Sequence, residues 1–212
     1  CFSFLIMSNI LLIGGYGNIG SMLMKHGSRN NYLAVGRSNS SNKIDTINYN
    51  DIESIINVID HSKCKSVVLL SAISKLENCE SHPLESTNIN IKLPELIAQA
   101  CHILGKHLIF FSTDYVYNGN INTAKDEDIR NILPISRYAS QKYIAESKIL
   151  NMNINSLVLR IPRIYSIFHS NFLTNSLNLL KANTSLKIAS DQIFSPLSAA
   201  DLDFVLYKSS LI

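Results

Sequence analysis

A tyrosine and a lysine lie four residues apart in the segment YASQK at 138–142. The apolar periodicity predicts a helix over residues 135–150, so both side chains share one helical face. A ketone reduced by hydride needs a proton, and a tyrosine can donate it. The ordinary pKa of a tyrosine is about 10, and a nearby ammonium group lowers it towards the working range. We therefore expect Tyr138 to be a proton donor and Lys142 to assist it and to bind the cofactor ribose, although such a pair also occurs by chance.

Hydroxyl groups follow a buried strand predicted over residues 107–111. The sequence there continues as STDYVYNG at 112–119. A hydroxyl at the end of a parallel strand can hydrogen-bond a substrate carbonyl, because ligands bind at the carboxyl ends of such strands. Thr113 is the expected third catalytic residue, and the alternative is an ordinary turn that uses Ser, Thr and Asp to satisfy backbone groups.

A glycine-rich turn follows the first predicted strand, with the sequence GGYGNIG at 14–20. Gly14 permits the turn, Gly17 lets the backbone approach a pyrophosphate, and Gly20 lets the next helix pack against the sheet. Free N–H groups at the start of that helix favour a negative phosphate. The pattern predicts a dinucleotide site, and the alternative is a turn without a ligand.

The second predicted strand ends in Gly36-Arg37-Ser38, without a nearby acidic residue. An acidic side chain at this place holds the ribose 2′-OH of NAD, whereas arginine accepts the 2′-phosphate of NADP. Arg37 therefore favours NADPH as cofactor, with NADH as the second option. The alternative is that Arg37 is a solvated loop residue.

The elements that would position these residues alternate along the chain. They predict an α/β protein with a Rossmann-type, doubly wound parallel sheet and helices on both faces. We expect strands at 9–13, 32–35, 45–48, 66–70, 107–111, 156–160 and 186–189. Helices are expected at 18–26, 51–60, 85–104, 135–150, 172–182 and from about 199, with a polar loop at 118–131.

Composition excludes several function classes. The chain of 212 residues is 46% hydrophobic and 17% charged with a net charge of +3, and it has no basic run for nucleic acid or a membrane surface. No apolar stretch reaches the ~20 residues of a membrane span, and no signal peptide is recognised. The four cysteines and six histidines lack metal-ligand spacing, and no G-x-S-x-G elbow is present. We expect a cytoplasmic protein without a metal.

Taken together, the motifs resemble the dTDP-4-dehydrorhamnose reductases, a branch of the extended short-chain dehydrogenases/reductases. The resemblance covers nearly the whole chain from Ser8. It rests on GGYGNIG at 14–20, ESTNIN at 85–90, STDYVYNG at 112–119, YASQKYIAES at 138–147, VLRIPRIYS at 158–166 and DQIFSPLSAADL at 191–202.

This resemblance implies reduction of the 4-keto group of a nucleotide-linked deoxy sugar, giving dTDP-L-rhamnose for surface polysaccharide. It implies a nucleotide-sugar substrate and leaves a homodimer open. Asn90 matches a helix asparagine that supports the active site. The implied cofactor contacts are Gly17, Asn18, Ile19, Ser71, Ala72 and Ile73, and the implied sugar contacts are Thr113 and Asp114.

The chain departs from the family pattern near the substrate. Where relatives often carry a tryptophan, it has Arg163, and it contains no Trp at all. Ala139, Phe194 and Leu197 replace a usual glycine, glycine and threonine. Arg163 could meet a phosphate or carboxylate of the substrate, or be a surface arginine.

We expect residues 1–212 to form a single NAD(P)-binding domain, with 1–7 as a leader outside the core and 161–212 as partial substrate-binding elements. Relatives continue further, so the C-terminal lobe is either reduced or missing from this sequence. Two other functions remain open: a nucleotide-sugar epimerase or dehydratase that keeps its dinucleotide, and a non-catalytic dinucleotide-binding regulatory subunit, similar to the methionine adenosyltransferase β subunit.

Overall fold

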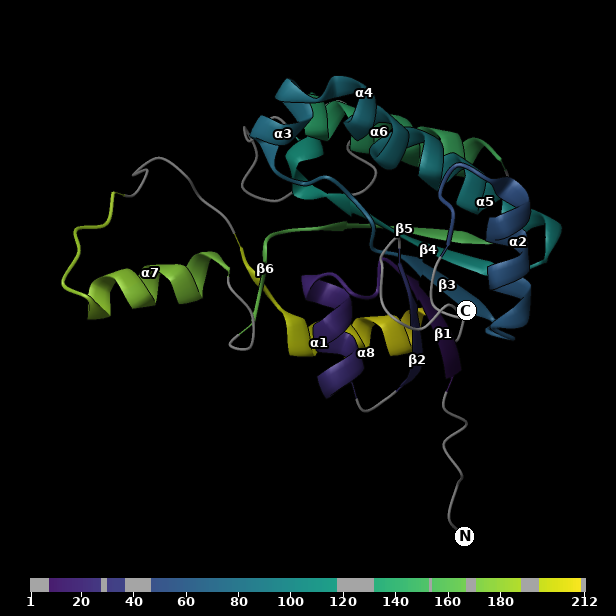
Figure 1. The fold of residues 1–212 in the computed structure, drawn as a ribbon, viewed down its shortest axis with the longest axis horizontal. Helices are drawn as coiled ribbons and strands as arrows, with labels where there is room; N and C mark the ends of the chain where they lie inside the picture. Colours follow the sequence, from purple (N-terminus) through teal and green to yellow (C-terminus); the bar gives the residue numbers. More distant parts are fainter. Residues whose placement is uncertain are drawn as a thin grey trace, which may run out of the picture.

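A parallel five-stranded sheet forms the centre of the molecule (Figure 1). The computed structural model describes residues 8–27, 30–36, 47–117, 132–152, 154–166, 171–187 and 195–210. The strand order is β2-β1-β3-β4-β5, and every pairing is parallel. The bounds are β1 Ser8–Ile13, β2 Asn30–Val35, β3 Ser66–Leu69, β4 His107–Thr113 and β5 Ser156–Ile161. The predicted doubly wound Rossmann-type sheet is therefore confirmed.

Alternate residues of the central strands face two separate apolar layers. Leu11, Val67 and Phe110 belong to one buried cluster, while Leu12, Val68 and Phe111 belong to the other. All of these side chains are at most 5% exposed. Because both faces are apolar, the continuous hydrophobic runs in the sequence become central strands.

Helices cover both faces (Figure 1). One layer contains α2 Ile52–His61, α5 Leu93–Ile103 and α6 Arg137–Asn151, and the other contains α1 Asn18–His26 and α8 Ala199–Ser209. The C-terminal helix α8 is fastened to β2, because buried Asp203 accepts a hydrogen bond of 2.7 Å from the hydroxyl of Tyr32.

The helix expected over residues 85–104 is interrupted. Its first part is α4 Pro83–Thr87, followed by a π-helical turn at Asn88–Lys92 and then by α5, which has Pro94 in its first turn. Proline lacks an N–H and clashes with the carbonyl four residues earlier, so a wider turn before it is expected physically. The short helix α3 Leu76–Ser81 was not anticipated.

Two expected strands are not found where the chain is described. Ile47 and Asn48, from the strand predicted at 45–48, are not in a strand, although Ile47 is buried and its N–H donates to the Gly36 carbonyl at 3.2 Å. Residues 186 and 187 are likewise not in a strand. Instead, a small second sheet pairs β6 Ile164–Tyr165 with β7 Leu197–Ser198. The leader 1–7 and the loop 118–131 lie outside the described residues.

Helix α7, Phe172–Lys181, lies apart from both layers (Figure 1). A capping box at Asn171 and Thr174 starts it, but none of its residues is buried. Among the residues with described coordinates, no helix combines the length and apolar character needed to cross a bilayer.

Candidate active site

A cavity of about 620 Å³ lies at the carboxyl ends of the central strands. Its walls come from the turn after β1, the segments after β3, β4 and β5, and helix α6. A smaller cavity of about 270 Å³ shares Gly14, Gly17, Leu70 and Ala72 with it. The two cavities together follow the sheet edge, which is where nucleotide folds bind extended ligands.

The turn after β1 requires glycine at its first position. Gly14 has φ of +88°, and a Cβ there would lie 2.7 Å from the backbone nitrogen of Ser71. The N–H groups of Gly14 and Gly15 both donate to the carbonyl of Val35, at 2.8 and 3.1 Å. The turn after β1 and the segment after β3 therefore approach each other too closely for any side chain at position 14.

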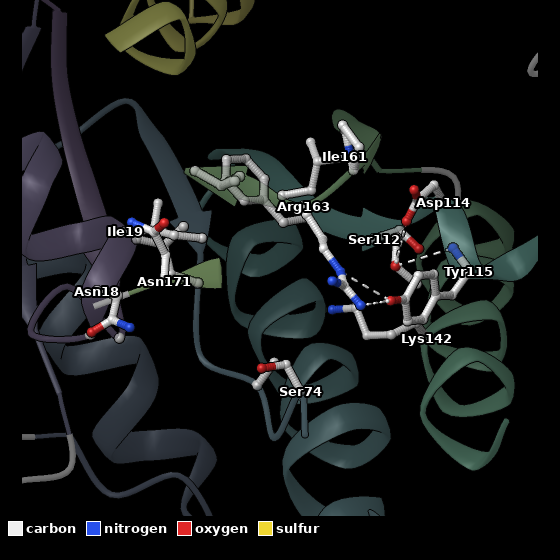
Figure 2. A pocket seen from close by; sticks show the side chains of 18 of the residues that line it. Asn18, Ile19, Ser74, Ser112, Asp114, Tyr115, Lys142, Ile161, Arg163 and Asn171 are labelled. Carbon is white, nitrogen blue, oxygen red and sulfur yellow. Dashed lines mark hydrogen bonds between the residues drawn. The ribbon is translucent and has the colours of Figure 1, made fainter. Parts of the chain in front are cut away.

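Helix α1 begins at this turn without a side-chain cap. Its N-cap residue is Gly17, and its first turn contains no acidic side chain. Asn18 and Ile19 line the large cavity on the α1 side (Figure 2). Uncapped N–H groups at a helix start carry partial positive charge, so this end of the cavity suits a phosphate.

Two tyrosines line the smaller cavity. The Tyr16 hydroxyl donates to the Ala34 carbonyl at 3.1 Å, and its ring packs so close to Gly36 that a Cβ there would approach the ring to 2.9 Å. Tyr49 and Ser71 share a hydrogen bond of 2.5 Å between their hydroxyl oxygens. Arg37 lies outside the described residues, directly after the wall formed by Gly36.

Thr113, Tyr138 and Lys142 all line the large cavity. Thr113 is the last residue of β4, and its hydroxyl oxygen accepts the N–H of Tyr115 at 3.2 Å while its hydroxyl donates to Asp114 at 3.3 Å. Tyr138 and Lys142 come from the first turns of α6, which starts at Ser136 with a side-chain cap to the N–H of Ala139. The sequence-predicted hydroxyl, phenol and ammonium therefore meet in one space.

Burial governs the ionisation of this trio. It raises the pKa of Tyr138 above its ordinary value, with smaller upward contributions from Cys79, Asp114 and Tyr115 and a downward one from Thr113. Burial lowers the pKa of Lys142 to about 7, and Glu146 opposes that change. Burial also raises the pKa of Asp114, against hydrogen bonds led by Thr113 and the charge of Arg163. Tyr138 therefore holds its proton at neutral pH, as a donor must.

Arg163 reaches into the same cavity from the segment after β5. Figure 2 shows its guanidinium directed towards Tyr115, whose hydroxyl accepts from Nη2 at 3.0 Å and from Nε at 3.3 Å. The guanidinium carbon is 5.8 Å from the centroid of the Phe172 ring at the start of α7. Arg163 is thus held by Tyr115, which follows Thr113 by two residues and which the sequence alone did not single out.

The family model described as RmlD substrate binding domain matches residues 7–209. The chain belongs to this family. A dTDP-4-dehydrorhamnose reductase of Sinorhizobium fredii is 33% identical over 136 residues, which are 64% of this chain and 46% of that protein. The methionine adenosyltransferase 2 subunit beta of Bos taurus is 28% identical over 158 residues, covering 74% and 47%. The chain spans about half the length of these curated relatives.

A solved structure of a dTDP-4-dehydrorhamnose reductase from Bacillus anthracis, in complex with NADP, superimposes with a TM-score of 0.85. It is 22% identical and covers 98% of this chain and 72% of that chain. The fold of the RmlD family is therefore present from β1 to α8.

Within this family fold, Asn90 connects the segment after β3 to helix α6. Its side-chain oxygen accepts the N–H of Ile73 at 2.9 Å, and its amide donates to the Ile73 carbonyl at 3.0 Å and to Gln141 Oε1 at 2.8 Å. Gln141 in turn donates to the hydroxyl of Ser86 at 2.9 Å. Asn90 sits in the π-helical turn, so the wider turn places its side chain between two walls of the cavity.

Most predicted site residues line the two cavities, with Ile73 as an exception. Ser71 lines the smaller cavity and Ala72 lines both, whereas Ile73 is held by Asn90 and packs against the buried core. Sequence reasoning did not identify several cavity residues. These are Tyr16 and Tyr49 in the smaller cavity and Ser74, Leu76, Ser112, Tyr115, Ser166 and Asn171 in the larger one. Their proximity follows from strand order, which no local motif encodes.

Proposed function

We propose that this chain carries out NADPH-dependent reduction of the 4-keto group of a nucleotide-linked deoxy sugar. The observation that carries the proposal is the meeting of Thr113, Tyr138 and Lys142 beside the uncapped start of α1, in one cavity of about 620 Å³. The relatives named dTDP-4-dehydrorhamnose reductase support this substrate class.

The described residues fit a dinucleotide along the sheet edge. Gly14 allows the turn after β1 to pack directly against Ser71, and Gly17, Asn18 and Ile19 offer helix-start N–H groups to a pyrophosphate. Gly20, Ser71, Ala72 and Ile73 are proposed to complete this wall. We assign preference for NADPH over NADH to Arg37, on the sequence pattern alone.

Each catalytic side chain has a definite task. NADPH, when bound, supplies the hydride to the carbonyl carbon. Tyr138 donates its phenolic proton to the carbonyl oxygen, so the ketone, the hydride and this proton together give a secondary alcohol, and the phenolate then regains a proton from solvent. Thr113 hydrogen-bonds the same oxygen as negative charge develops on it. The Lys142 ammonium stabilises the phenolate left on Tyr138 and binds the ribose hydroxyls.

Arg163 and Asp114 are proposed to hold the substrate. Arg163 lies at the cavity wall between Tyr115 and Phe172, where a guanidinium can pair with an oxyanion. Asp114 follows Thr113 directly and can accept a sugar hydroxyl. The resemblance of the motifs further supports a cytoplasmic role in dTDP-L-rhamnose supply for surface polysaccharide, with a homodimer as the assembly to test.

The direct test is oxidation of NADPH by the purified chain in the presence of a dTDP-4-keto-6-deoxy sugar. We expect turnover that is lost in Tyr138→Phe, while NADPH binding and thermal unfolding of the variant stay unchanged. Unchanged turnover by the variant would reject the assignment of Tyr138.

Two alternatives predict different results. An epimerase or dehydratase would copurify with tightly bound NAD and show no net NADPH oxidation. A regulatory subunit would bind NADPH without turnover and copurify with a partner; relatives named methionine adenosyltransferase 2 subunit beta are the observation behind it. The STDYV run at 112–116 and the Arg37 pattern argue against the epimerase or dehydratase, and the presence of Thr113, Tyr138 and Lys142 in one cavity favours an enzyme over a regulatory subunit.

A further inference from the structure

A buried ion pair lies one helical turn beyond Lys142. Glu146 follows Lys142 by four residues on α6, so the two side chains share a face. Arg160 of β5 donates to Glu146 from Nη2 at 2.8 Å and from Nε at 3.1 and 3.2 Å. Its Nη1 donates to the hydroxyl of Tyr117 at 2.9 Å. The side chain of Glu146 is 2% exposed and that of Arg160 is 14% exposed, so the pair is largely shielded from water.

The sheet places this pair in the same layer as the lysine. Arg160 is the register partner of Ser112, and neighbours in register on parallel strands project to the same face. Phe110 lies two residues before Ser112 on that face, and its ring centroid is 4.0 Å from the Lys142 nitrogen. The hydroxyl of Ser112 is buried without a hydrogen-bond partner. A cation in this layer therefore has little water to support it.

Glu146 is the charged group that opposes the effect of burial on Lys142. Burial lowers the pKa of Lys142 to about 7, and the carboxylate of Glu146 raises it. Asp114 and Tyr115 from the turn after β4 and Cys79 from α3 act on the pKa of Tyr138. From α5, Glu95 pairs with Lys148 at 2.7 Å, where both side chains are at least 30% exposed. From β5, Arg160 forms charged hydrogen bonds to the carboxylate of Glu146 and thereby reduces the effect of that carboxylate on Lys142.

We propose that Glu146 and Arg160 form a positioning unit that sets the charge state of Lys142 beside Tyr138, with opposite effects of the two partners, and thereby sets the alkaline limit of the reduction. Neither residue lines the cavity, so both act through Lys142. Glu146 supports the ammonium, and Arg160 moderates that support by binding the same carboxylate. This inference rests on the proposed function of the site, because it assigns a task to the pair in that reaction.

The two partners have opposite expected effects when removed. In Glu146→Gln the ammonium loses its carboxylate and faces the charge of Arg160, so the alkaline limb of NADPH oxidation moves to lower pH by about one unit. In Arg160→Gln the whole charge of Glu146 acts on Lys142, and the limb moves to higher pH. A purely structural pair would reduce activity in both variants without opposite displacements of the pH profile.

Two further variants keep the test decisive. Glu95→Gln removes a carboxylate that pairs with Lys148 of α6 and should leave the pH profile at its wild-type position. The double variant Glu146→Gln/Arg160→Gln removes both charges of the ion pair, so neither partner is left buried alone, and it should fold even where a single variant does not. In this variant the alkaline decline of NADPH oxidation should occur at lower pH than in the wild type. A decline at the same pH as in the wild type would overturn the proposal.

A second readout separates this inference from the proposed function. The titration of Lys142, followed by NMR of the nitrogen-labelled lysines in the substrate-free protein, should shift as the pH profiles do. If the lysine signal shifts but no nucleotide keto sugar is reduced by the wild type, the proposed function fails and the electrostatic coupling stands. If reduction occurs and the lysine signal is unmoved in both single variants, the coupling is refuted.

Discussion

The central sheet and the segment that follows it differ sharply in how they are packed. In β3 and β4 every residue is buried, whereas none is buried in α7 and every residue of β6 and β7 is partly exposed. Of the proposed reacting groups, Thr113 ends β4, and Tyr138 and Lys142 lie on α6, which packs against the sheet, whereas Arg163 belongs to the segment that follows the sheet. The molecule thus holds its chemistry on densely packed elements and its proposed substrate contact on sparsely packed ones. The proposed proton transfer therefore depends on rigidly packed side chains, and the proposed substrate contact depends on a side chain with fewer packing restraints.

The largest expected effect tests the densely packed region at the buried Lys142. Lys142→Met should reduce turnover by about 10²–10⁴-fold, because the phenolate on Tyr138 loses its support. The pKa of Lys142 is lowered in the folded state to about 7, so the unfolded chain binds the proton more tightly. This lysine therefore destabilises the fold below pH 7, and the effect fades as pH rises towards its ordinary pKa.

Thermal unfolding of the wild type and of Lys142→Met over a range of pH measures this destabilisation. The variant should be more stable than the wild type below pH 7, by up to about 5 kcal/mol when the shift from the ordinary lysine pKa is converted directly. The gain should decline at alkaline pH. A gain that grows with pH would contradict the assignment of a buried, proton-releasing lysine.

The difference in packing between the two regions can be measured by making the same substitution, Leu→Ala, once in each region. Leu69 in β3 is 1% exposed, and Leu177 in α7 is 46% exposed. Leu69→Ala should lower the free energy of unfolding by about 2–5 kcal/mol, because it leaves a cavity in the core. Leu177→Ala should change it by less than about 0.5 kcal/mol. Equal losses in denaturant titrations would show that α7 is buried by contacts absent from this structure.

Arg163 tests whether the sparsely packed region selects the substrate. Arg163→Met should weaken substrate binding by about 10–100-fold, the loss expected for a hydrogen-bonded ion pair. It should leave NADPH affinity and unfolding unchanged. Steady-state kinetics would show the loss in KM, and a fall in kcat with KM constant would instead place Arg163 in the chemical step.

The smallest effect concerns the dinucleotide. Arg37→Ala should weaken NADPH binding by about tenfold and leave NADH binding nearly unchanged, because only NADPH carries the 2′-phosphate. Fluorescence titration with each dinucleotide would measure both constants. A parallel loss for both would remove Arg37 from the phosphate site.

Local patterns predicted the elements that depend on local chemistry. Helix α1 was predicted with its observed bounds, because Gly17 and Gly27 flank its apolar periodicity. Helix α3 was missed because it is six residues long and its N-cap, Lys75, provides no capping side chain. The β6–β7 pair was missed because each strand has two residues and their pairing spans 33 positions of sequence, from Ile164 to Leu197.

The residues of the candidate site also separate into those that local motifs indicate and those that only tertiary structure brings together. Tyr138 and Lys142 were found because helical spacing places them on one face, and Thr113 was found because it ends a strand. The hydrogen bond of Arg163 to Tyr115 and the ion pair of Arg160 with Glu146 depend on strand register and helix packing. No motif within a short window encodes such contacts, so they could be recognised only in three dimensions.

The side chain of Asn90 binds both the N–H and the carbonyl of Ile73 and also reaches Gln141, which lies between Tyr138 and Lys142 on α6. The segment proposed to contact the dinucleotide and the helix that carries the proposed proton donor are thus joined by the hydrogen bonds of one side chain. A ligand that displaces the segment after β3 would displace the proton donor with it. Residue 141, which lines neither cavity, is accordingly a place from which the alignment of cofactor and acid can be altered without touching either.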